Sequence, residues 1–477
     1  MSIIERLDVD PIMTAAAAAA PAAAAATADT RAGWLGAVAG ALDACADELV
    51  AIADRETHLG SDRLSGELVR TTNQLRFFGR VAVEGSYLEV CIDHADPSAV
   101  PPRPDLRRML RPLGPVAVFA ASNFPFAFSV AGGDTASALS VGCPVVVKAH
   151  PGHPDLSRRV ADITAAALTE AGAPDGVFGM VEGFESGPAL VTHPATSAVA
   201  FTGSTAGGRA LFDLAVGRPD PIPFHGELGS VNPVVVLPAA DAARGGELAD
   251  GLAASMLSGV GQFCTKPGVV FVPRRSKVES SIRVAGPLPT MLTPLIEAAF
   301  ERGVADLIST PGVEVICGDP GGPLVLAADD VTVIRHPGLL RTEVFGPVTL
   351  LVRYSGDGLS EALGLLEGSL TATMHAEPSD PVEAVIARLE PLAGRLLFDG
   401  WPTGVAVAWS QHHGGPWPAS TSPFTSVGAT AVRRFLRPVV YQSAPDALLP
   451  PALQEHNPWG IPRRVDGRID LGPRMAG

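Results

Sequence analysis

One cysteine lies where its thiol could react covalently with a substrate. Cys264 occupies the segment Gly-Gln-Phe-Cys-Thr-Lys-Pro-Gly at 261–268, whose glycines and proline favour a turn. A carboxylate lies upstream at Glu227, and a side-chain amide lies further upstream at Asn123. A thiol, a base and an amide donor together suit nucleophilic attack on a carbonyl group, with the developing oxyanion held by the amide. The alternative is a buried structural cysteine, because free thiols are among the most buried side chains.

Two loops that follow predicted strands could hold the phosphates and ribose of a nucleotide. The first contains Phe201, Thr202, Gly203 and Ser204. It opens a predicted helix, where backbone N–H groups attract a phosphate, but its spacing differs from the Gly-x-Gly-x-x-Gly dinucleotide motif. The second contains Lys148, His150 and His153, and it follows a strand whose carboxyl end would face the ligand crevice of an open α/β sheet. Each loop could equally be an ordinary surface turn.

The composition limits the class of protein and its partners. A chain of 477 residues is too long for one compact core, so we expect two or three domains. The formal net charge of −15 argues against nucleic acid or an anionic membrane surface as a partner. The 5 cysteines include no Cys-x-x-Cys pair, so neither a disulfide framework nor a zinc site is expected. His412 and His413 resemble a metal pair, but without a third ligand at usable spacing we interpret them as loop residues and assign no metal.

The N-terminal region carries an alanine tract but no recognisable targeting signal. The tract at 15–26 is broken by Pro21, and we predict that it is a helix rather than a membrane span. The residues before it carry three acidic side chains and one arginine, unlike the positively charged start of a secretory signal. We therefore expect a cytoplasmic protein without a membrane partner, in a reducing compartment that would keep a nucleophilic thiol intact.

The order of predicted elements indicates an α/β protein with two units. The first elements are helices at 30–56 and 62–84 and strands at 87–92 and 106–113. From residue 114, short apolar strands alternate with helices at spacings that suit right-handed crossovers and a parallel sheet. A second alternation begins at residue 234 and includes a helix at 294–302, with Thr293 as its cap and Pro294 in its first turn. The last element is an extended segment at 432–442, followed by a proline-rich tail.

Six motifs occur in the order typical of the aldehyde dehydrogenase superfamily, which the chain resembles from about residue 30 to about residue 440. They are Ser-Asn-Phe-Pro around Asn123, Lys148, Phe-Thr-Gly-Ser at 201–204, Glu-Leu-Gly from Glu227, Gly-Gln-Phe-Cys ending at Cys264, and Glu-Val-Phe-Gly-Pro from Glu343. Within the superfamily, the chain looks most like the α-ketoglutaric semialdehyde (2,5-dioxopentanoate) dehydrogenases and the related NADP-linked fatty aldehyde dehydrogenases. The stretches that carry this narrower resemblance are 70–78, 148–154, 400–404, 414–418 and 457–461.

The resemblance implies an α/β aldehyde dehydrogenase fold, with two doubly wound Rossmann-like α/β domains and a small β bridging or oligomerisation element. The implied boundaries are 1–85 and 114–229 for the cofactor-binding domain, 230–430 for the catalytic domain, 86–113 and 431–442 for the bridging element, and 443–477 for a C-terminal tail. In the family, the C-terminal strand extends the sheet of a partner subunit, so a homodimer or a tetramer is expected. An exposed edge strand without such a partner invites uncontrolled pairing.

The resemblance assigns roles in aldehyde oxidation to Cys264, Asn123 and Glu227. Cys264 would attack the aldehyde carbon, and the Asn123 side chain and the Cys264 backbone N–H would hold the oxyanion of the thiohemiacetal. After hydride transfer to the nicotinamide, Glu227 would activate the water that hydrolyses the thioester. This glutamate argues against an acyl-CoA-forming relative, since such enzymes usually lack the base.

A nicotinamide cofactor is implied by the same resemblance. Its predicted contacts are Lys148, His150, His153, Phe201, Thr202, Gly203, Ser204, Gly229, Glu343 and Phe345. Lys148 would contact the adenosine ribose and Ser204 the pyrophosphate. Glu343 would hold the nicotinamide ribose, with Phe345 packed near the nicotinamide. Many NAD-preferring relatives carry a glutamate three residues after the lysine, where this chain has Pro151, so NADP is favoured and NAD remains possible.

The predicted substrate is 2,5-dioxopentanoate, which would be oxidised to 2-oxoglutarate. Arg70 could bind its distal carboxylate, although an arginine on a helix surface is more often a structural ion-pair partner. Phe124, Phe263 and Trp417 could line an apolar channel to the thiol or lie in the core. The loop at 420–425 lacks an arginine that many relatives carry there, which keeps a medium- or long-chain aliphatic aldehyde open.

Two other classes of function remain open from the sequence. A member of the fold without activity would serve as a structural or binding protein, although the intact Cys264, Glu227 and Asn123 argue against it. An esterase-type hydrolase could use the same thiol and base on activated esters. A requirement for the nicotinamide cofactor separates an aldehyde dehydrogenase from both.

Overall fold

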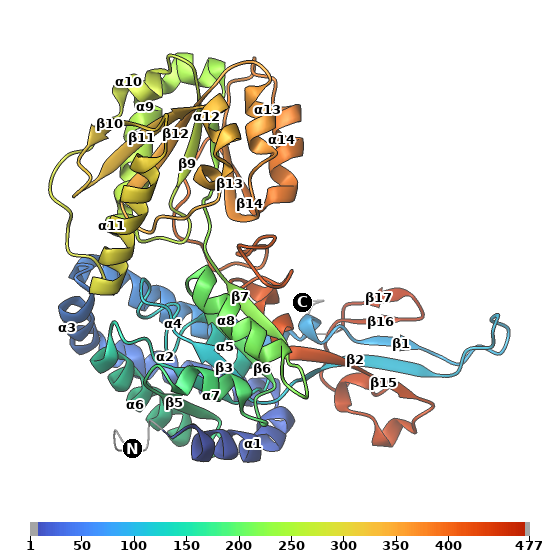
Figure 1. Ribbon diagram of the computed structural model, residues 1–477. Helices are drawn as coiled ribbons and strands as arrows, with labels where there is room; N and C mark the ends of the chain where they lie inside the picture. Colours follow the sequence, from blue (N-terminus) through green and yellow to red (C-terminus); the bar gives the residue numbers. More distant parts are fainter. Residues whose placement is uncertain (1–7, 473–477) are drawn as a thin grey trace.

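The computed structural model describes residues 8–472, which form two α/β domains and an extended β arm (Figure 1). The ends of the predicted cofactor domain and tail, at 1–7 and 473–477, lie outside the described residues. Figure 1 places the second domain above the first, with the arm projecting to one side. None of the helices between residues 8 and 472 has the length and apolarity required to cross a membrane.

The first domain is built on a parallel five-stranded sheet in the order β5-β4-β3-β6-β7. Its strands are β3 Val116–Phe119, β4 Val145–Lys148, β5 Phe178–Val181, β6 Ala198–Thr202 and β7 Phe224–Glu227. Successive residues of β3 face opposite layers of helices: Val116 and Val118 pack on one side, and Ala117 and Phe119 pack on the other. Because helices cover both faces, β3 is buried along its whole length, as expected for a parallel sheet.

Helices cover both faces of this sheet. One face carries α1 Val9–Ala25, α7 Ser186–Thr192 and α8 Thr205–Val216, and the other carries α2 Ala28–Ala44, α3 Ala46–Thr57, α4 Ser61–Glu84, α5 Gly133–Ser140 and α6 Pro154–Glu170. The alanine tract is helical, as predicted, and Asp8 caps its helix α1. The single helix predicted at 30–56 is wrong, because it is interrupted at Cys45, whose φ of −107° and ψ of 16° end α2. Asp47 and Glu48 in the first turn of α3 then favour a new helix start.

The second domain contains a seven-stranded sheet in the order β10-β11-β12-β9-β8-β13-β14, in which β10 is antiparallel to β11 and the other pairs are parallel. The strands are β8 Val234–Val236, β9 Val269–Pro273, β10 Glu314–Gly318, β11 Leu324–Asp329, β12 Val348–Tyr354, β13 Ser369–His375 and β14 Ala393–Phe398. The helices are α9 Pro238–Leu257 and α10 Lys277–Ser281 on one face, and α11 Pro294–Ser309, α12 Asp330–Arg335, α13 Gly358–Leu363 and α14 Glu383–Leu389 on the other. The start of α11 is as predicted, with the Thr293 hydroxyl accepting a hydrogen bond from the Ile296 N–H at 3.2 Å. The two doubly wound α/β domains of the expected fold are therefore present.

The arm is a third sheet in the order β15-β2-β1-β16-β17. Its strands are β1 Cys91–Asp93, β2 Leu106–Pro112, β15 Leu436–Gln442, β16 Arg463–Val465 and β17 Arg468–Asp470. Strand β15 pairs with β2 in antiparallel register. The segment expected to be a plain tail also supplies β16 and β17, which turn at Asp466 and Gly467, both with positive φ. This Asp-Gly pair is a strong hairpin signal, which the prediction of a tail did not take into account.

Short 3-10 helices connect several of these elements. They lie at Ser86–Leu88, Ser258–Gly261, Pro337–Leu340, Glu390–Leu392, Ala429–Phe435, Asp446–Leu448 and Pro451–Leu453.

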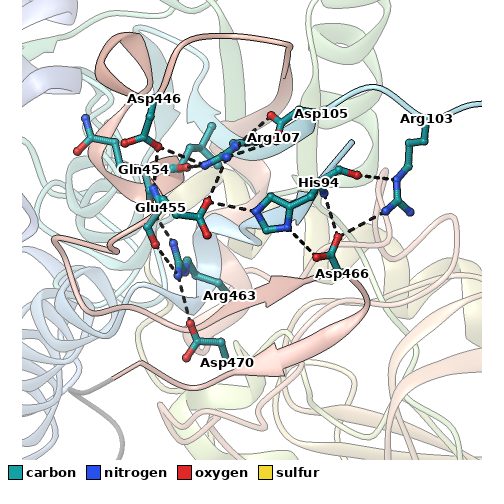
Figure 2. Close-up of polar contacts among 11 residues, drawn as sticks. His94, Arg103, Asp105, Arg107, Asp446, Gln454, Glu455, Arg463, Asp466 and Asp470 are labelled. Carbon is teal, nitrogen blue, oxygen red and sulfur yellow. Dashed lines mark hydrogen bonds and ion pairs between the residues drawn. The ribbon is translucent and has the colours of Figure 1, made fainter. Parts of the chain in front are cut away.

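A polar network fastens the C-terminal hairpin to the arm (Figure 2). His94, just after β1, lies 2.6 Å from Asp466 through Nδ1 and 3.2 Å from Glu455 through Nε2. Arg107 of β2 pairs with Glu455 at 3.1 Å and donates to the Leu453 carbonyl at 2.8 Å. Hydrogen bonds donated to Asp466 and then to Glu455 raise the pKa of His94, and the bond from His94 lowers the pKa of Asp466. The hairpin is thus held by charge pairs rather than by a large apolar core.

The attachment of the hairpin is expected to weaken as pH rises. Because the folded-state pKa of His94 is raised, its stabilisation is fully present below the unfolded pKa of about 6.5 and is lost as pH rises through the folded value. His94→Gln should therefore lower the melting temperature more at pH 6 than at pH 8.5, by a small amount because the ring is 38% exposed. His456→Gln, an exposed histidine on the same segment, is the control. Equal destabilisation by His94→Gln at both pH values would contradict the expectation.

Candidate active site

Cys264 lies in an irregular segment between the 3-10 helix at Ser258–Gly261 and β9. Gly261 begins the segment with a φ of +66°, and a side chain there would collide with the backbone of Gly346. The Asn232 side chain donates to the Cys264 carbonyl at 2.8 Å and to the Lys266 carbonyl at 3.0 Å. These contacts fix the backbone at and after the cysteine, so the position of Sγ is set by hydrogen bonds rather than by a regular element.

The carboxylate of Glu227, the last residue of β7, is buried beside the thiol. Its Oε2 accepts a hydrogen bond from Ser426 Oγ at 2.5 Å, and its Oε1 lies 2.9 Å from His413 Nε2. No hydrogen-bond donor within the described chain is aligned with Oε1. Burial alone would raise the pKa of Glu227, but His413 and the Ser426 hydrogen bond outweigh it and hold the pKa below its ordinary value. Glu227 is therefore a carboxylate at neutral pH.

His413 is a site residue that the sequence did not reveal. Its Nε2 lies 3.5 Å from Cys264 Sγ as well as 2.9 Å from Glu227 Oε1, and the side chain is 0% exposed. Its backbone is fixed by the Thr425 hydroxyl, which accepts from the His413 N–H, and by the Ser426 N–H, which donates to the His413 carbonyl, both at 2.8 Å. The segment around His413 is irregular, as predicted, but the His413 side chain contacts Cys264 and Glu227. The only local signal was its position directly before the 414–418 motif.

The electrostatic surroundings keep the thiol protonated. Burial, followed by the negative charges of Glu227 and Glu343, raises the pKa of Cys264 well above its ordinary value. A nucleophilic thiolate therefore has to form by loss of the Sγ proton during the reaction. His413 Nε2 lies 3.5 Å from Sγ, but the charge of His413 already compensates the Glu227 carboxylate, so water in the cavity that Cys264 lines would take that proton.

Asn123 is brought to the same loop from the first domain. Its Nδ2 donates to the Gln262 carbonyl at 2.9 Å, two residues before the cysteine. Its own carbonyl accepts from Arg63 Nη2 at 2.7 Å, which fixes the backbone. A side-chain amide carries two N–H donors, so one remains for a ligand at the thiol. The structure thus places Glu227 beside Cys264 and brings Asn123 to the loop that carries the thiol, an arrangement suited to covalent chemistry on a carbonyl.

An apolar cavity of about 360 Å³ opens at the thiol. Its lining comprises Arg70, Phe124, Phe128, Cys264, Thr265, Gly404, Val405, Ala406 and His413. Phe263 supports this wall, because its ring stacks on Phe124 with the centroids 5.2 Å apart. Phe128 is a lining residue that we did not predict. Trp417 does not line this cavity; it is 50% exposed and lies in a second one.

Arg70, on helix α4, presents a guanidinium to this cavity with donors to spare. Its Nη2 donates to the Val405 carbonyl at 3.2 Å, and its Cζ lies 5.4 Å from the centroid of the Phe128 ring. Its Nη1 is buried and has no hydrogen-bond partner in the described chain. Burial lowers the pKa of Arg70, but an arginine side chain remains charged in proteins. An unpaired cation in an apolar pocket is a binding site for an anionic group.

The second cavity, of about 480 Å³, collects part of the predicted cofactor set. Ser204, Gly229 and Glu343 line it, together with Thr205, Ser230 and Trp417. Ser204 caps α8 and leaves the N-terminus of this helix facing the cavity, where a phosphate is favoured. A side chain at Gly229 would collide with Glu343 and Thr205, so this glycine keeps the cradle open. A nicotinamide dinucleotide therefore fits the residues present.

Glu343 shares its surroundings with a buried lysine. Burial raises the pKa of Glu343, against the attraction of Lys266, and lowers the pKa of Lys266. The Lys266 ammonium also donates to the Val348 carbonyl at 2.7 Å. Phe345, two residues after Glu343, is half-buried but does not line this cavity.

The loop after β4 lies apart from this cavity. Lys148 ends β4, is half-buried and forms no ion pair with any residue from 8 to 472. His150 accepts from the Gly152 N–H at 3.0 Å, and burial, His153 and Lys148 lower its pKa to about 3, so it is neutral. His153 is not at the surface, because both ring nitrogens contact neighbours, at 3.0 Å to the Ala121 carbonyl and 3.1 Å to Ser157 Oγ. Lys148 is the available cation of this loop.

In the loop after β6, Ser204 lines the second cavity, whereas the three residues before it do not. Phe201 packs its ring near those of Phe119 and Phe224, with centroids 5.8 and 6.0 Å away, so it supports the sheet. Thr202 is half-buried, and Gly203 is exposed and donates its N–H to the Glu227 carbonyl at 3.1 Å. That bond ties this loop to the end of β7, where the catalytic carboxylate was predicted.

Two relatives of established name are similar to this chain over nearly its whole length. Alpha-ketoglutaric semialdehyde dehydrogenase 2 of Azospirillum brasilense is 47% identical over 467 residues, which cover 92% of this chain and 89% of that protein. Alpha-ketoglutaric semialdehyde dehydrogenase of Acinetobacter baylyi is 41% identical over 479 residues, which cover 96% of this chain and 91% of that protein.

Solved structures confirm the predicted fold at much lower sequence identity. A 1-pyrroline-5-carboxylate dehydrogenase from Thermus, solved with bound NAD, matches with a TM-score of 0.74 and 21% identity, over 91% of this chain and 84% of that one. A betaine aldehyde dehydrogenase from Staphylococcus aureus, in complex with NAD+, matches with a TM-score of 0.76 and 19% identity, over 92% of this chain and 89% of that one.

A family-wide sequence profile gives the decisive match. The profile described as "Aldehyde dehydrogenase family" covers residues 2–415 of this sequence. With the two relatives above, it confirms the predicted enzyme class, oxidation of an aldehyde with NAD or NADP as the acceptor. The chain belongs to the aldehyde dehydrogenase family.

Proposed function

We propose that this aldehyde dehydrogenase oxidises 2,5-dioxopentanoate to 2-oxoglutarate. The observation that carries this substrate is Arg70, whose side chain lines the cavity at Cys264 and whose Nη1 has no hydrogen-bond partner in the described chain. The semialdehyde would place its aldehyde at the thiol and its carboxylate at the guanidinium. Charge-assisted bonds between arginine and a carboxylate are strong, so they favour this substrate over neutral aldehydes. Two relatives named for the same semialdehyde support the assignment.

The reaction would begin at a neutral thiol. The Sγ proton would pass to water in the cavity as the sulfur of Cys264 attacks the aldehyde carbon. The free Nδ2–H of Asn123 and the Cys264 backbone N–H would hold the oxyanion as its charge develops. Bound NAD(P) supplies the hydride acceptor for this oxidation, and the substrate carbon then remains attached to Cys264 as a thioester.

Hydrolysis of the thioester would depend on Glu227. Ser426 holds Oε2, whereas Oε1 faces the site without an aligned donor, so Oε1 is the atom that would accept a proton from the attacking water. The lowered pKa of Glu227 keeps it ionised and ready to act as a base at neutral pH. The departing sulfur of Cys264 would recover the proton that Glu227 has taken from the attacking water.

We also infer that NADP is used in preference to NAD. Lys148 is half-buried at the end of β4 and forms no ion pair with residues 8–472, which leaves its charge for a 2′-phosphate. The position three residues later, Pro151, is exposed and carries no carboxylate to repel that phosphate. The neutral state of His150 means that Lys148, rather than the histidines, would supply the attraction.

A homodimer or tetramer in the cytoplasm is part of the proposal. Strand β15 lies at the edge of the arm, paired only with β2 among the described strands, and its Val440 is 54% exposed. An unprotected edge strand on a projecting arm supports pairing with a second copy. The free thiol of Cys264 and the absence of any disulfide among the described cysteines support a reducing compartment.

A medium- or long-chain aliphatic aldehyde is the second candidate substrate. The walls of the Cys264 cavity are largely apolar, with Phe124, Phe128, Val405 and Ala406 among the lining residues. Such walls would accept an alkyl chain, provided that it left the Arg70 guanidinium to water.

Replacing the proposed base should separate hydride transfer from hydrolysis. In Glu227→Gln, one equivalent of NAD(P)H per site should form in a burst, while steady turnover falls by about 10²- to 10⁴-fold, the usual contribution of a general base. In Cys264→Ser, both burst and turnover should be lost. Stopped-flow absorbance of the reduced nicotinamide measures both phases. Unchanged steady turnover in Glu227→Gln would show that another group activates the water.

Replacing Arg70 should discriminate between the two substrates. Arg70→Met should lower kcat/KM for 2,5-dioxopentanoate by about 10- to 150-fold, since a hydrogen bond to a charged group contributes about 1.5–3 kcal/mol. The kcat/KM for hexanal should change little. Arg76→Met, on the same helix but paired with Asp43 at 2.6 Å on the surface, is the matched control. Equal losses with both aldehydes would remove the support for the semialdehyde.

The cofactor preference should depend on residue 151. The wild-type enzyme should have a higher kcat/KM with NADP than with NAD. Pro151→Glu should lower kcat/KM with NADP at least about tenfold and spare NAD, because juxtaposed like charges cost several kcal/mol. Steady-state kinetics with both cofactors measure the ratio, and a strong wild-type preference for NAD would refute the inference.

A further inference from the structure

Three side chains at the thiol together offer a set of metal ligands. Cys264 Sγ, His413 Nε2 and one carboxylate oxygen of Glu227 all lie within 4.8 Å of one another. Thiolate, imidazole and carboxylate are the ligand types that zinc takes, and three protein ligands with one open position form the common open zinc site. The sequence did not reveal this cluster, because Cys264 and Glu227 lie 149 and 186 positions before His413.

The spacing of the ligand atoms suits a tetrahedral ion. Zinc bonds of about 2.3 Å to sulfur and about 2.0–2.1 Å to nitrogen and oxygen place tetrahedral ligands about 3.3–3.6 Å apart. Sγ and Nε2 are 3.5 Å apart, and Nε2 and Oε1 are 2.9 Å apart. The sulfur and nitrogen are already at the required separation, and the oxygen lies a few tenths of an ångström too close to the nitrogen.

The carboxylate oxygen and the surrounding backbone favour this use. Oε1 of Glu227 is buried without an aligned donor in the described chain, so it has an unused lone pair directed at the cluster. Ser426 holds the other oxygen at 2.5 Å, and backbone bonds fix His413. The fourth position would open on the cavity that Cys264 and His413 line, where water or a substrate oxygen can enter.

The surroundings of His413 predict that a bound ion exchanges with solvent instead of staying permanently bound. A histidine that holds a permanent zinc ion usually donates its second ring N–H to an acceptor. Nδ1 of His413 is buried and has no such partner among residues 8–472. The first coordination sphere is thus available, while the support that retains an ion over time is missing.

We propose that Cys264, His413 and Glu227 form a reversible inhibitory site for Zn²⁺, or for a thiophilic divalent ion of similar size. Binding would displace the protons on Sγ of Cys264 and on Nε2 of His413 to solvent, form Zn–S, Zn–N and Zn–O bonds, and involve no change of oxidation state. The bound ion would occupy the sulfur lone pair and the carboxylate oxygen that the proposed oxidation uses. Zinc and aldehyde would therefore exclude each other. The inference rests on the proposed catalytic site.

Direct binding tests the site independently of turnover. Equilibrium dialysis of metal-free enzyme against ZnCl₂ should give one tight equivalent per chain, and CoCl₂ should produce the sulfur-to-cobalt charge-transfer absorption of a thiolate ligand. His413→Gln should weaken zinc binding by more than about 100-fold, since even the loss of a supporting group costs about 10- to 100-fold. Cys264→Ser should abolish the charge-transfer band. His412→Gln, the adjacent half-buried histidine outside the cluster, should behave as wild type.

Inhibition kinetics provide a second measurement, and they distinguish the zinc proposal from the proposed aldehyde oxidation. Zinc should inhibit aldehyde oxidation competitively with the aldehyde, and EDTA should restore full activity. Unchanged stoichiometry and affinity in both His413→Gln and Cys264→Ser, or a cobalt complex without the sulfur band, would overturn the zinc site while leaving the proposed oxidation intact. Failure of the oxidation itself would appear in metal-free buffer with EDTA present, where zinc plays no part.

Discussion

The burial of a negative charge at Glu227 is the constraint on which the rest of the site depends. The residue is only 5% exposed, and a buried carboxylate is costly unless charged and hydrogen-bonding partners compensate for the lost water. His413 and Ser426 provide that compensation, and both belong to one segment, which also pairs with the end of β7 through Ser420. The segment that neutralises the carboxylate therefore also seals it from water.

The two sheets can then supply the remaining groups without further distortion. Parallel strands end at one edge of a sheet, so β7 delivers Glu227 beside the loop after β6, whose Ser204 caps α8. The second domain meets this edge with the irregular segment before β9, which Asn232 holds and which contains Cys264. Gly229 and Gly261 sit where backbones or side chains approach too closely for any Cβ. A nucleophile and a base on separate domains thus meet at one point.

Structural features that depend on residues close together in the sequence could be predicted from the sequence. The apolar strands from residue 116 onward and the Thr293 cap depend on neighbouring residues, and they lie where they were expected. The strand predicted at 87–92 is wrong in its first half, which is a 3-10 helix at Ser86–Leu88, and β1 spans only Cys91–Asp93. The break at Cys45 was missed because the apolar stripe continues across it, from Leu42 to Leu49. The strands at 463–470 are short and rich in arginine, so they lack the apolar alternation of a strand despite their Asp-Gly turn. His413 was missed because its role comes from contacts far away in the chain.

The charges that make Glu227 a ready base also oppose the formation of a thiolate. Glu227 and Glu343 stabilise the protonated thiol, so Cys264 rests in its less reactive form, which limits its oxidation when substrate is absent. Removal of the proton then requires a nearby acceptor or an added positive charge. His413 supplies a positive charge there, because it lowers the pKa of Glu227 and its Nε2 lies 3.5 Å from the sulfur. A positive charge that enters this space is attracted by the same carboxylates, so the electrostatics that restrain the nucleophile also make the site receptive to cations.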